Sequence, residues 1–306
     1  MKSQRNKTID FSIEQSKPYL DKCIAQENAQ EICPNSIVVG DTFECLKKIK
    51  DNSVDLLIVD PPYNMDKTFH GNGFKKMSQD KYCEYTREWI KATIKKLKPT
   101  ASVFVCCDWK SSLVIGNVLQ EFFILRNRIT WQREKGRGSK NNFKNSMEDI
   151  FYATVSEQFT FNLSNVMQRR KVIAPYKENG KPKDWFETSQ GKFRDSCPSN
   201  FWDDISIPYW SMAENTAHPT QKPEKLIAKL ILACSNENQV VLDPFGGSGT
   251  TAVVCEKLNR QYISIEQNPL YCAWAQYRIE QAKKDKTIQG YEDGVFWEKN
   301  SKPEKK

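Results

Sequence analysis

The stretch Asp60-Pro61-Pro62-Tyr63-Asn64 puts a carboxylate, two prolines, an aromatic ring and an amide in direct succession. Consecutive prolines fix their φ angles and favour extended backbone before them, so the stretch predicts a stiff turn. Pro61 lacks an N–H, but its carbonyl oxygen remains an acceptor. Together with the Asp60 carboxylate and the flat face of Tyr63, it suits a flat heterocycle that carries an exocyclic amine. For Asp-Pro-Pro alone, a rigid turn without chemistry is the simpler interpretation.

A second stretch, Asp243-Pro244-Phe245-Gly246-Gly247-Ser248-Gly249-Thr250-Thr251, is rich in glycine. Glycines permit a tight turn and a close approach of the backbone to a ligand. No lysine precedes the threonines, so this is not a phosphate-binding P-loop, and the glycine order does not match G-x-G-x-x-G. The stretch therefore favours a nucleoside-type ligand over a dinucleotide, and disfavours a hydride-transferring enzyme.

Glu266 ends a strand-like run about 15 residues after Thr251. An acid at such a position accepts hydrogen bonds from both hydroxyls of a ribose. A solvated strand end is the alternative interpretation of Glu266 taken alone. Beside the glycine-rich stretch, we favour the ribose.

Regular alternation of strands and helices must position these residues. The apolar run Val54–Val59 predicts a buried strand directly before Asp60. Further strands are predicted at 37–41, 101–107, 123–131, 149–155, 240–242 and 262–266, and helices near 42–49, 80–97, 113–122, 223–231, 250–258 and 269–282. The helix at 80–97 is expected to stop at Pro99, and residues 65–79 to form a loop. This pattern predicts an α/β protein with a doubly wound, mostly parallel sheet. Between 156 and 214 the alternation fails, which indicates an insertion.

Composition excludes several classes of protein. The chain has 306 residues, 39% of them hydrophobic, and shows no segment of transmembrane length. Its start is polar, so we expect a cytoplasmic protein without a membrane partner. The 10 cysteines include no Cys-x-x-Cys pair and there are only 2 histidines, so we expect reduced thiols and no metal site.

The positive charge is concentrated in the middle of the chain. Net charge is +8, and residues 120–200 carry 15 Lys and Arg against 9 Asp and Glu. A basic region of this kind is typical of nucleic-acid binding.

Three motifs in this order resemble the signatures of S-adenosylmethionine-dependent DNA amino-methyltransferases of the beta group, the restriction-modification type: Asp60–Tyr63, His218-Pro219-Thr220-Gln221-Lys222-Pro223, and Asp243–Thr251. The resemblance spans about residues 36–282. It implies a circularly permuted, Rossmann-like methyltransferase sheet with an inserted target-recognition region. The strands at 37–41 and 54–59 would then follow, in space, those at 240–243 and 262–266.

The resemblance also implies a division of the chain. Residues 1–35 would be an N-terminal extension and 286–306 a polar tail. Residues 36–155 would form the catalytic half of the methyltransferase domain and 215–285 its cofactor-binding half. Residues 156–214, with the basic loop around Gly136 and Gly138, would recognise the target.

Roles for individual residues follow from the same resemblance. Phe245 to Gly249 would wrap the methionine part of S-adenosylmethionine, Glu266 would hold its ribose, and Asp41 would lie near its adenine. His218 and Lys222 would close over the methionine end, with Lys222 paired to the cofactor's carboxylate. The expected cofactor-binding set is Asp41, Asp60, His218, Lys222, Asp243, Phe245, Gly246, Gly247, Ser248, Gly249, Thr250 and Glu266. The expected catalytic set is Asp60, Pro61, Pro62 and Tyr63.

The implied reaction is methylation of the exocyclic N6 of an adenine flipped out of duplex DNA. Asp60 and the Pro61 carbonyl would accept the amine hydrogens and Tyr63 would stack on the base. Aspartate at the first motif position resembles the adenine enzymes, whereas serine is usual in the cytosine-N4 enzymes. Cytosine-N4 methylation, RNA base methylation and a catalytically silent DNA-binding module remain as alternatives. Relatives of this kind are often homodimers, and some are accompanied by a cognate restriction endonuclease.

Overall fold

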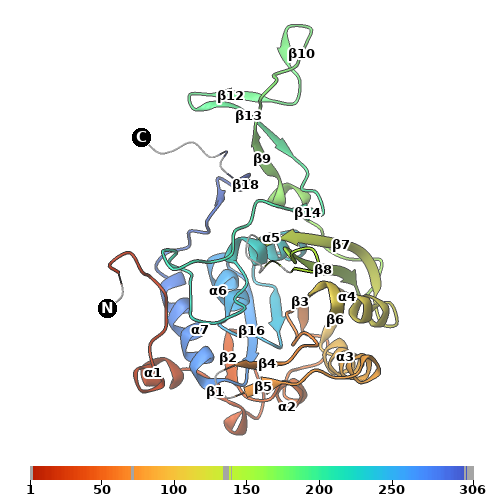
Figure 1. Ribbon diagram of the computed structural model, residues 1–306, viewed down its shortest axis with the longest axis vertical. Coiled ribbons are helices and arrows are strands. Elements are labelled where there is room, and N and C mark those ends of the chain that lie inside the picture. The colour runs from red at the N-terminus through yellow and green to blue at the C-terminus, as the bar shows by residue number, and fades with distance from the viewer. Residues whose placement is uncertain (1–2, 70–71, 134–137, 139, 300, 302–306) are drawn as a thin grey trace.

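A nine-stranded mixed sheet forms the centre of the molecule, with helices on both faces (Figure 1). The computed structural model describes residues 3–69, 72–133, 138, 140–299 and 301. In sheet order the strands are β1 (Ile24–Ala25), β2 (Ser36–Val39), β16 (Gln261–Glu266), β15 (Val240–Asp243), β3 (Val54–Val59), β6 (Leu97–Cys107), β8 (Met147–Thr154), β7 (Ile124–Gln132) and β14 (Phe201–Trp202). The strands from β1 to β6 run parallel, and β8 runs antiparallel to both of its neighbours.

The strand order confirms the circular permutation. Strands β15 and β16 come late in the chain, yet they lie between β2 and β3, which come early. The pairing is direct, because Val241 of β15 is in register with Leu56 of β3, and Ile265 of β16 with Val38 of β2. The two ends of the chain thus build the same half of the sheet.

Side chains of each central strand divide between two cores. Leu56 and Ile58 of β3 belong to one hydrophobic cluster, whereas Leu57 and Val59 belong to the other. This alternation follows from the pleat of a strand, and each fully buried aliphatic side chain contributes about 1.5–3 kcal/mol. The first cluster is covered by α5 (Glu224–Cys234), α6 (Thr250–Lys257) and α7 (Pro269–Ala282), and the second by α2 (Thr42–Lys47), α3 (Gln79–Ile94) and α4 (Trp109–Leu119).

The sheet changes winding direction between β15 and β3. From β15 the chain crosses through α6 to β16, and from β3 it crosses through α3 to β6, on the other side. Ligands of open α/β sheets bind at the carboxyl ends of the strands where such a reversal occurs. The topology therefore puts the ligand crevice between the glycine-rich stretch and the Asp60 turn.

Pro99 lies inside β6 and does not stop a helix, contrary to our prediction. Helix α3 ends at Ile94, and β6 begins at Leu97. The pairing of β6 with β3 jumps from Leu97 opposite Val54 to Ser102 opposite Leu56. Proline is tolerated in such an irregular stretch because no regular ladder needs its missing N–H.

A second sheet, here called the arm sheet, rises away from the nine-stranded sheet (Figure 1). Its five strands in order are β12 (Phe186–Thr188), β13 (Gly191–Ser196), β9 (Gln168–Lys171), β18 (Val295–Trp297) and β17 (Tyr291–Glu292). A small hairpin of β10 (Lys177–Glu178) and β11 (Lys181–Pro182) extends from it, and the 3-10 helix η2 (Leu163–Val166) precedes β9.

The C-terminal segment corrects our prediction of a polar tail over residues 286–306. Strands β17 and β18 fall inside that range, and Phe296 is fully buried. Within this lysine-rich segment, the short apolar run Val295–Trp297 forms β18, which pairs in parallel with β9. Likewise, residues 65–79 contain a hairpin of β4 (Lys67–Phe69) and β5 (Asn72–Phe74) where we expected a loop. Gly136 lies outside the described residues.

The N-terminal extension packs on the last helix of the nine-stranded sheet. Helix α1 (Ile13–Leu20) contacts α7, and the rings of Phe11 and Tyr19 lie against Tyr277, with centroids 5.7 and 5.2 Å away. The indole of Trp274 donates to the Phe11 carbonyl at 3.2 Å. The 3-10 helix η1 (Gln26–Asn28) then leads to β2. Aromatic packing therefore fixes this extension to the sheet.

Candidate active site

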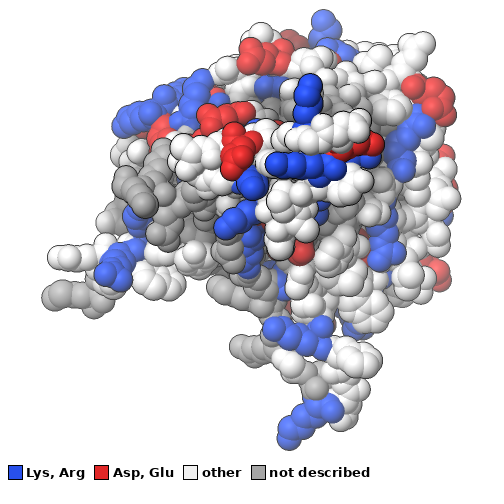
Figure 2. Space-filling model, turned by 90° about the horizontal axis from the view of Figure 1, so that it is seen from above, with Lys and Arg blue, Asp and Glu red and all other residues white. Residues whose placement is uncertain are grey.

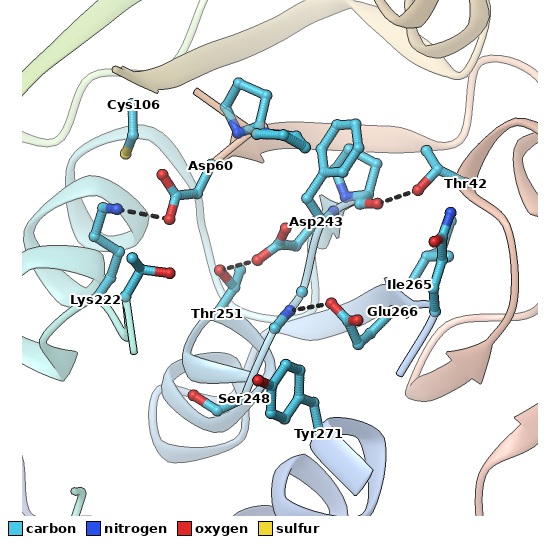
Figure 3. A pocket seen from close by; sticks show the side chains of 18 of the residues that line it. Thr42, Asp60, Cys106, Lys222, Asp243, Ser248, Thr251, Ile265, Glu266 and Tyr271 are labelled. Carbon is cyan, nitrogen blue, oxygen red and sulfur yellow. Dashed lines mark hydrogen bonds and ion pairs between the residues drawn. The ribbon is translucent and has the colours of Figure 1, made fainter. Parts of the chain in front are cut away.

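Four acidic residues stand at the carboxyl ends of four neighbouring parallel strands: Asp41 after β2, Glu266 on β16, Asp243 on β15 and Asp60 after β3. All four line one pocket with a cavity of about 430 Å³, a size that suits a small-molecule ligand (Figure 3). Of the other residues predicted for the site, the pocket lining includes all but Gly249: Pro61, Pro62, Tyr63, His218, Lys222, Phe245, Gly246, Gly247, Ser248 and Thr250.

The glycine loop is pressed against β16. The Gly246 N–H donates to the Ile265 carbonyl at 2.8 Å, and a Cβ added at Gly246 would lie 2.1 Å from Ser264 Oγ. A side chain at this position would therefore force the loop away from the strand. Gly249 has φ +75° and faces α7, where its Cβ would lie 2.3 Å from the Cβ of Ala275. Its role is in packing the loop, which explains its absence from the pocket lining.

Glu266 is held by backbone donors on both oxygens. Its Oε2 accepts from Gly247 N at 2.9 Å and its Oε1 from Asn268 N at 2.8 Å. Burial raises the pKa of Glu266 above its usual value, although these backbone hydrogen bonds oppose the shift. A carboxylate has about four lone-pair sites, so Glu266 can accept two further hydrogen bonds from a ligand.

Asp41 caps α2 and is fixed by that role. Its Oδ1 accepts from Phe43 N at 2.9 Å and Glu44 N at 3.1 Å, and its Oδ2 accepts from Gln267 Nε2 at 3.1 Å. The cap explains why the chain turns sharply here. It leaves Asp41 at the rim of the pocket next to the end of β16.

Asp243 braces the glycine loop from within. Its Oδ2 accepts from the Thr251 hydroxyl at 2.6 Å and its Oδ1 from Phe245 N at 3.1 Å. Burial raises the pKa of Asp243 to about 7, and these two hydrogen bonds oppose the shift. The carboxyl thus ties the start of the loop to the first turn of α6.

Asp60 and Tyr63 form a hydrogen-bonded pair at the mouth between β3 and β15. The Tyr63 hydroxyl donates to Asp60 Oδ1 at 2.8 Å. Burial, together with Asp60 and Glu148, raises the pKa of Tyr63 well above its usual value, so the hydroxyl keeps its proton. No donor among the described residues bonds to the Pro61 carbonyl, which therefore remains an acceptor for a ligand.

The turn after Asp60 is braced on its far side. The Tyr82 hydroxyl donates to the Pro62 carbonyl at 3.0 Å. Asn64 exchanges two hydrogen bonds with the Met77 backbone, at 2.7 and 3.0 Å. Asn64, to which the sequence assigned no role, thus fixes the turn to the segment before α3.

His218 covers the glycine loop. A Cβ added at Gly247 would lie 3.2 Å from the His218 ring, and the ring meets Tyr271 edge-on with centroids 4.5 Å apart. The imidazole thus closes one wall of the pocket.

Lys222 is directed at Asp60, which corrects its predicted pairing with a ligand carboxylate. Its ammonium lies 2.6 Å from Asp60 Oδ2 and 3.2 Å from Glu148 Oε2, and only 8% of its side chain is exposed (Figure 3). Burial alone would lower the pKa of Lys222, but the two carboxylates outweigh burial and raise it. The sequence could not show this, because Asp60, Glu148 and Lys222 lie on three separate segments.

Sequence reasoning missed several residues in and beside the pocket. Glu148 does not line the pocket but pairs with Lys222; it comes from β8, and its one signal is two successive acids, Glu148 and Asp149, at the start of an apolar run. Outside the three motifs, the remaining lining is mostly apolar or aromatic, for example Phe43, Tyr85, Ile265 and Tyr271.

The pocket offers neither a thiolate nor a metal site. Cys106 lines it, but burial raises the pKa of this thiol well above its usual value. Among the described residues, no group of His, Cys, Asp and Glu is arranged to hold a metal ion. Within the described residues, no helix is both long enough and apolar enough to span a membrane.

Comparison with known proteins gives consistent matches. Residues 54–277 match a family model described as DNA methylase, whose name covers N6 and N4 methyltransferases. The chain is 33% identical over 252 residues to the type II methyltransferase M.HpaI of Haemophilus parainfluenzae, spanning 81% of this chain and 73% of that protein. It is 31% identical over 254 residues to the DNA adenine methyltransferase YhdJ of Escherichia coli (strain K12), spanning 81% and 83%. The solved complex of M1.HpyAVI with SAM has the same fold, with a TM-score of 0.54 at 24% identity over 79% of this chain and 98% of that one.

Proposed function

The chain belongs to the DNA methylase family, and from this premise we propose that it transfers a methyl group from S-adenosylmethionine to the exocyclic N6 of adenine in duplex DNA. One observation carries the proposal. The Asp60 turn, with its two acceptors, and the glycine loop line the same pocket from adjacent strands, β3 and β15. An amine-binding group and a nucleoside-binding loop thus face each other.

The pocket fits S-adenosylmethionine. Gly246 lets the backbone lie where any side chain would collide, and Glu266 retains acceptor capacity for ribose hydroxyls. Asp41 would stand near the adenine, and Phe245 to Ser248 would follow the methionine part. When bound, the cofactor supplies a methyl group on a sulfonium, which is a strong electrophile. The protein's task is to hold this group in line with the target amine.

Asp60 and Pro61 would accept the two hydrogens of the amine. The amine's lone pair is delocalised into the ring, so the nitrogen is a poor nucleophile. Hydrogen bonds from both hydrogens favour the tetrahedral nitrogen of the transition state, and this is electrostatic preorganisation. The nitrogen is cationic and acidic after transfer, so its proton leaves without a strong base. No histidine or cysteine is needed for that step.

Tyr63 would stack on the extruded base. Flipping a base out of duplex DNA costs a few kcal/mol, and stacking on an aromatic ring returns about 1–3 kcal/mol. The hydrogen bond from its hydroxyl to Asp60 holds the ring at a fixed angle to the acceptors. Pro62 would fix the position of Tyr63 relative to Asp60.

The basic arm sheet and its flanking segments would bind the DNA backbone. Seen from above, lysine and arginine are more widespread on this face than acidic residues (Figure 2). Segment 156–214 contains three of the five arm-sheet strands, β9, β12 and β13, and is our proposal for target recognition. Contacts with phosphates would position the duplex without specifying its sequence.

Several broader assignments rest on the relatives. The family supports DNA as the substrate, and the bacterial sources of the two relatives support a cytoplasmic location for this chain. The name type II methyltransferase supports a cognate restriction endonuclease as a partner. We also propose a homodimer, and sedimentation of the purified protein would test it.

Nucleoside analysis tests the proposed function. Purified protein would be incubated with duplex DNA and tritiated S-adenosylmethionine, and the DNA then digested to nucleosides. We expect the label in N6-methyl-2′-deoxyadenosine. Label only in N4-methylcytosine would replace adenine by cytosine as the target. Preference for structured RNA in competition, or binding of DNA without any transfer, would reject the DNA methyltransferase.

A further inference from the structure

Four polar side chains from three segments meet beside the amine-binding acceptors. Asp60 and Tyr63 follow β3, Lys222 precedes α5, and Glu148 lies on β8. The Lys222 ammonium lies 2.6 Å from Asp60 Oδ2, 3.2 Å from Glu148 Oε2 and 3.2 Å from the Tyr63 hydroxyl. An ammonium has three hydrogens to donate. Two hydrogen bonds run to Asp60 and Tyr63, and Glu148 forms an ion pair from a third side; we call this three-point arrangement the tripod.

Burial makes each charge in this cluster depend on its partners. Glu148 is only 5% exposed and Lys222 only 8%. Removing one partner of a buried ion pair leaves an uncompensated charge and is strongly destabilising. The second carboxylate oxygen of Glu148 faces the guanidinium of Arg133. Glu148 has a third partner in the Tyr63 hydroxyl, which lies 3.2 Å from Oε2. Lys222 and Tyr63 both lead to Asp60, and of the two only Lys222 carries a charge.

Asp60 needs this arrangement in order to serve a substrate. Tyr63 takes one lone pair of Oδ1 and Lys222 takes one of Oδ2. About two of the four lone-pair sites of the carboxylate stay available. Their direction depends on where the ammonium stands, because a shift of Lys222 rotates the carboxylate with it.

We propose that Glu148 is a positioning residue that acts through Lys222. By holding one corner of the tripod, Glu148 keeps the ammonium at Asp60 Oδ2, and the remaining lone pairs of Asp60 point towards the target amine. Glu148 touches neither substrate nor cofactor in this role. The inference rests on the proposed function, since it assigns a residue to that reaction.

Glu148→Gln tests the proposal, because it removes the charge and keeps the shape. At saturating DNA and cofactor we expect kcat to fall by about tenfold to a hundredfold, as for other misplaced catalytic groups. The affinity for S-adenosylmethionine, measured by calorimetry, should not change. Glu280→Gln is the matched control, since Glu280 lies on α7 outside the pocket lining and forms a partly exposed ion pair with Lys22. The wild-type protein must transfer label in the same assay. If it does not, the proposed function fails, whereas a normal kcat in Glu148→Gln overturns only the inference.

A double-mutant cycle separates the route through Lys222 from a structural role. If Glu148 acts through Lys222, the variant Lys222→Met/Glu148→Gln should have the same kcat as Lys222→Met alone, since coupled residues are not additive. This comparison also holds if Glu148→Gln by itself fails to fold, because the double variant carries no charge at position 148 or 222, and Asp60, which loses the ammonium, is 25% exposed to solvent. Arg133→Gln breaks only the other contact of Glu148 and should keep kcat at saturating DNA. If Arg133→Gln loses as much kcat as Glu148→Gln, Glu148 would instead act by holding Arg133 and the loop after β7.

Discussion

Asp60 combines two tasks that one carboxylate can perform only if it stays ionised and oriented. It pairs with the buried Lys222 ammonium, and it offers its remaining lone pairs to the pocket. Asp60→Ala should therefore lower methyl transfer by at least about a hundredfold to a thousandfold, as the loss of one preorganised partner does elsewhere. Binding of S-adenosylmethionine should survive at least in part, because Glu266 and the glycine loop remain. A filter-binding assay with tritiated cofactor, beside single-turnover transfer, measures both.

Asp80→Ala is the control for that experiment, since Asp80 is an exposed acid in the first turn of α3. Retention of transfer in Asp60→Ala would mean that the amine finds its acceptors elsewhere in the pocket.

Gly246 lies so close to Ser264 of β16 that it leaves no room for a side chain. Gly246→Ala should cost about 1–3 kcal/mol, the usual cost of overpacking, and weaken cofactor binding, because the new Cβ would lie 2.1 Å from Ser264 Oγ. Gly246→Ala/Ser264→Ala removes that oxygen, and the next contacts, at 3.4 Å, are tolerable. We expect the double variant to regain most of the lost affinity in calorimetry. Gly138→Ala, where a Cβ meets nothing within 4 Å, should bind the cofactor as tightly as the wild type. A double variant as weak as Gly246→Ala would refute the steric explanation.

At this scale, the sequence predicted which residues reach the pocket better than what each one contacts. Asp60 and Glu266 could be found because motif and strand end coincide. The partner of Lys222 could not be predicted, because the pairing depends on three segments that only the folded sheet brings together. Glu148 carries no motif, and its burial on β8 follows from packing.

At the scale of elements, the arm sheet contains an unfavourable pair that suggests what it binds. Arg170 of β9 stands directly opposite Arg194 of β13, and Glu298 lies 3.6 Å from Arg170. Like charges in such a cross-strand position are destabilising. Glu298 offsets the charge of Arg170, and an anion at Arg194 would relieve the repulsion further. Arg194→Ala should therefore weaken binding of duplex DNA and reduce the slope of log Kobs against log[salt] by about 0.9, the value for one phosphate contact.

Titrating DNA affinity between low and moderate salt measures that slope. Lys22→Ala on the N-terminal extension is the control, because Lys22 pairs with Glu280 on α7, which is not an element of the arm sheet. An unchanged slope in Arg194→Ala would remove this pair from the DNA interface.

The arm sheet also marks the limit of sequence-based prediction for elements. Strands of the central sheet were predictable because Val54–Val59 and similar runs are apolar throughout. Strand β18 has only three residues and lies in a charged segment, so its burial depends on β9, which is more than a hundred residues earlier in the chain. Short strands paired with distant partners carry no local period from which they can be predicted.

At the scale of the whole molecule, burial of Asp243 couples stability to pH. Burial raises the pKa of Asp243 to about 7 from the usual value of 3.8. The folded state therefore binds this proton more tightly than the unfolded state, and stability falls as pH rises from about 4 to about 7, by up to about 1.4 kcal/mol per pH unit. Asp243→Asn cannot ionise and lacks this dependence.

Urea unfolding of both proteins between pH 5 and pH 8, without cofactor, measures the effect. The stability of the wild type relative to Asp243→Asn should decrease with rising pH up to about 7 and then level off. The Thr251 hydroxyl can rotate to accept from the new amide, so the fold should tolerate the change. A difference that does not vary with pH would show that Asp243 titrates normally.

The permuted strand order has a consequence for folding during synthesis. On the ribosome, β2 and β3 emerge early, but each lacks one neighbour until β16 and β15 follow; Val240 reaches back 185 residues to bond with Asp55. Until then two central strand edges stay open, and open edges invite pairing with other chains. Pairing across so long a separation is also slow, because loop closure precedes any gain from the contact. A nascent chain thus has no assembled pocket until its last strands of the central sheet appear, and demand for chaperones should be greatest in that interval.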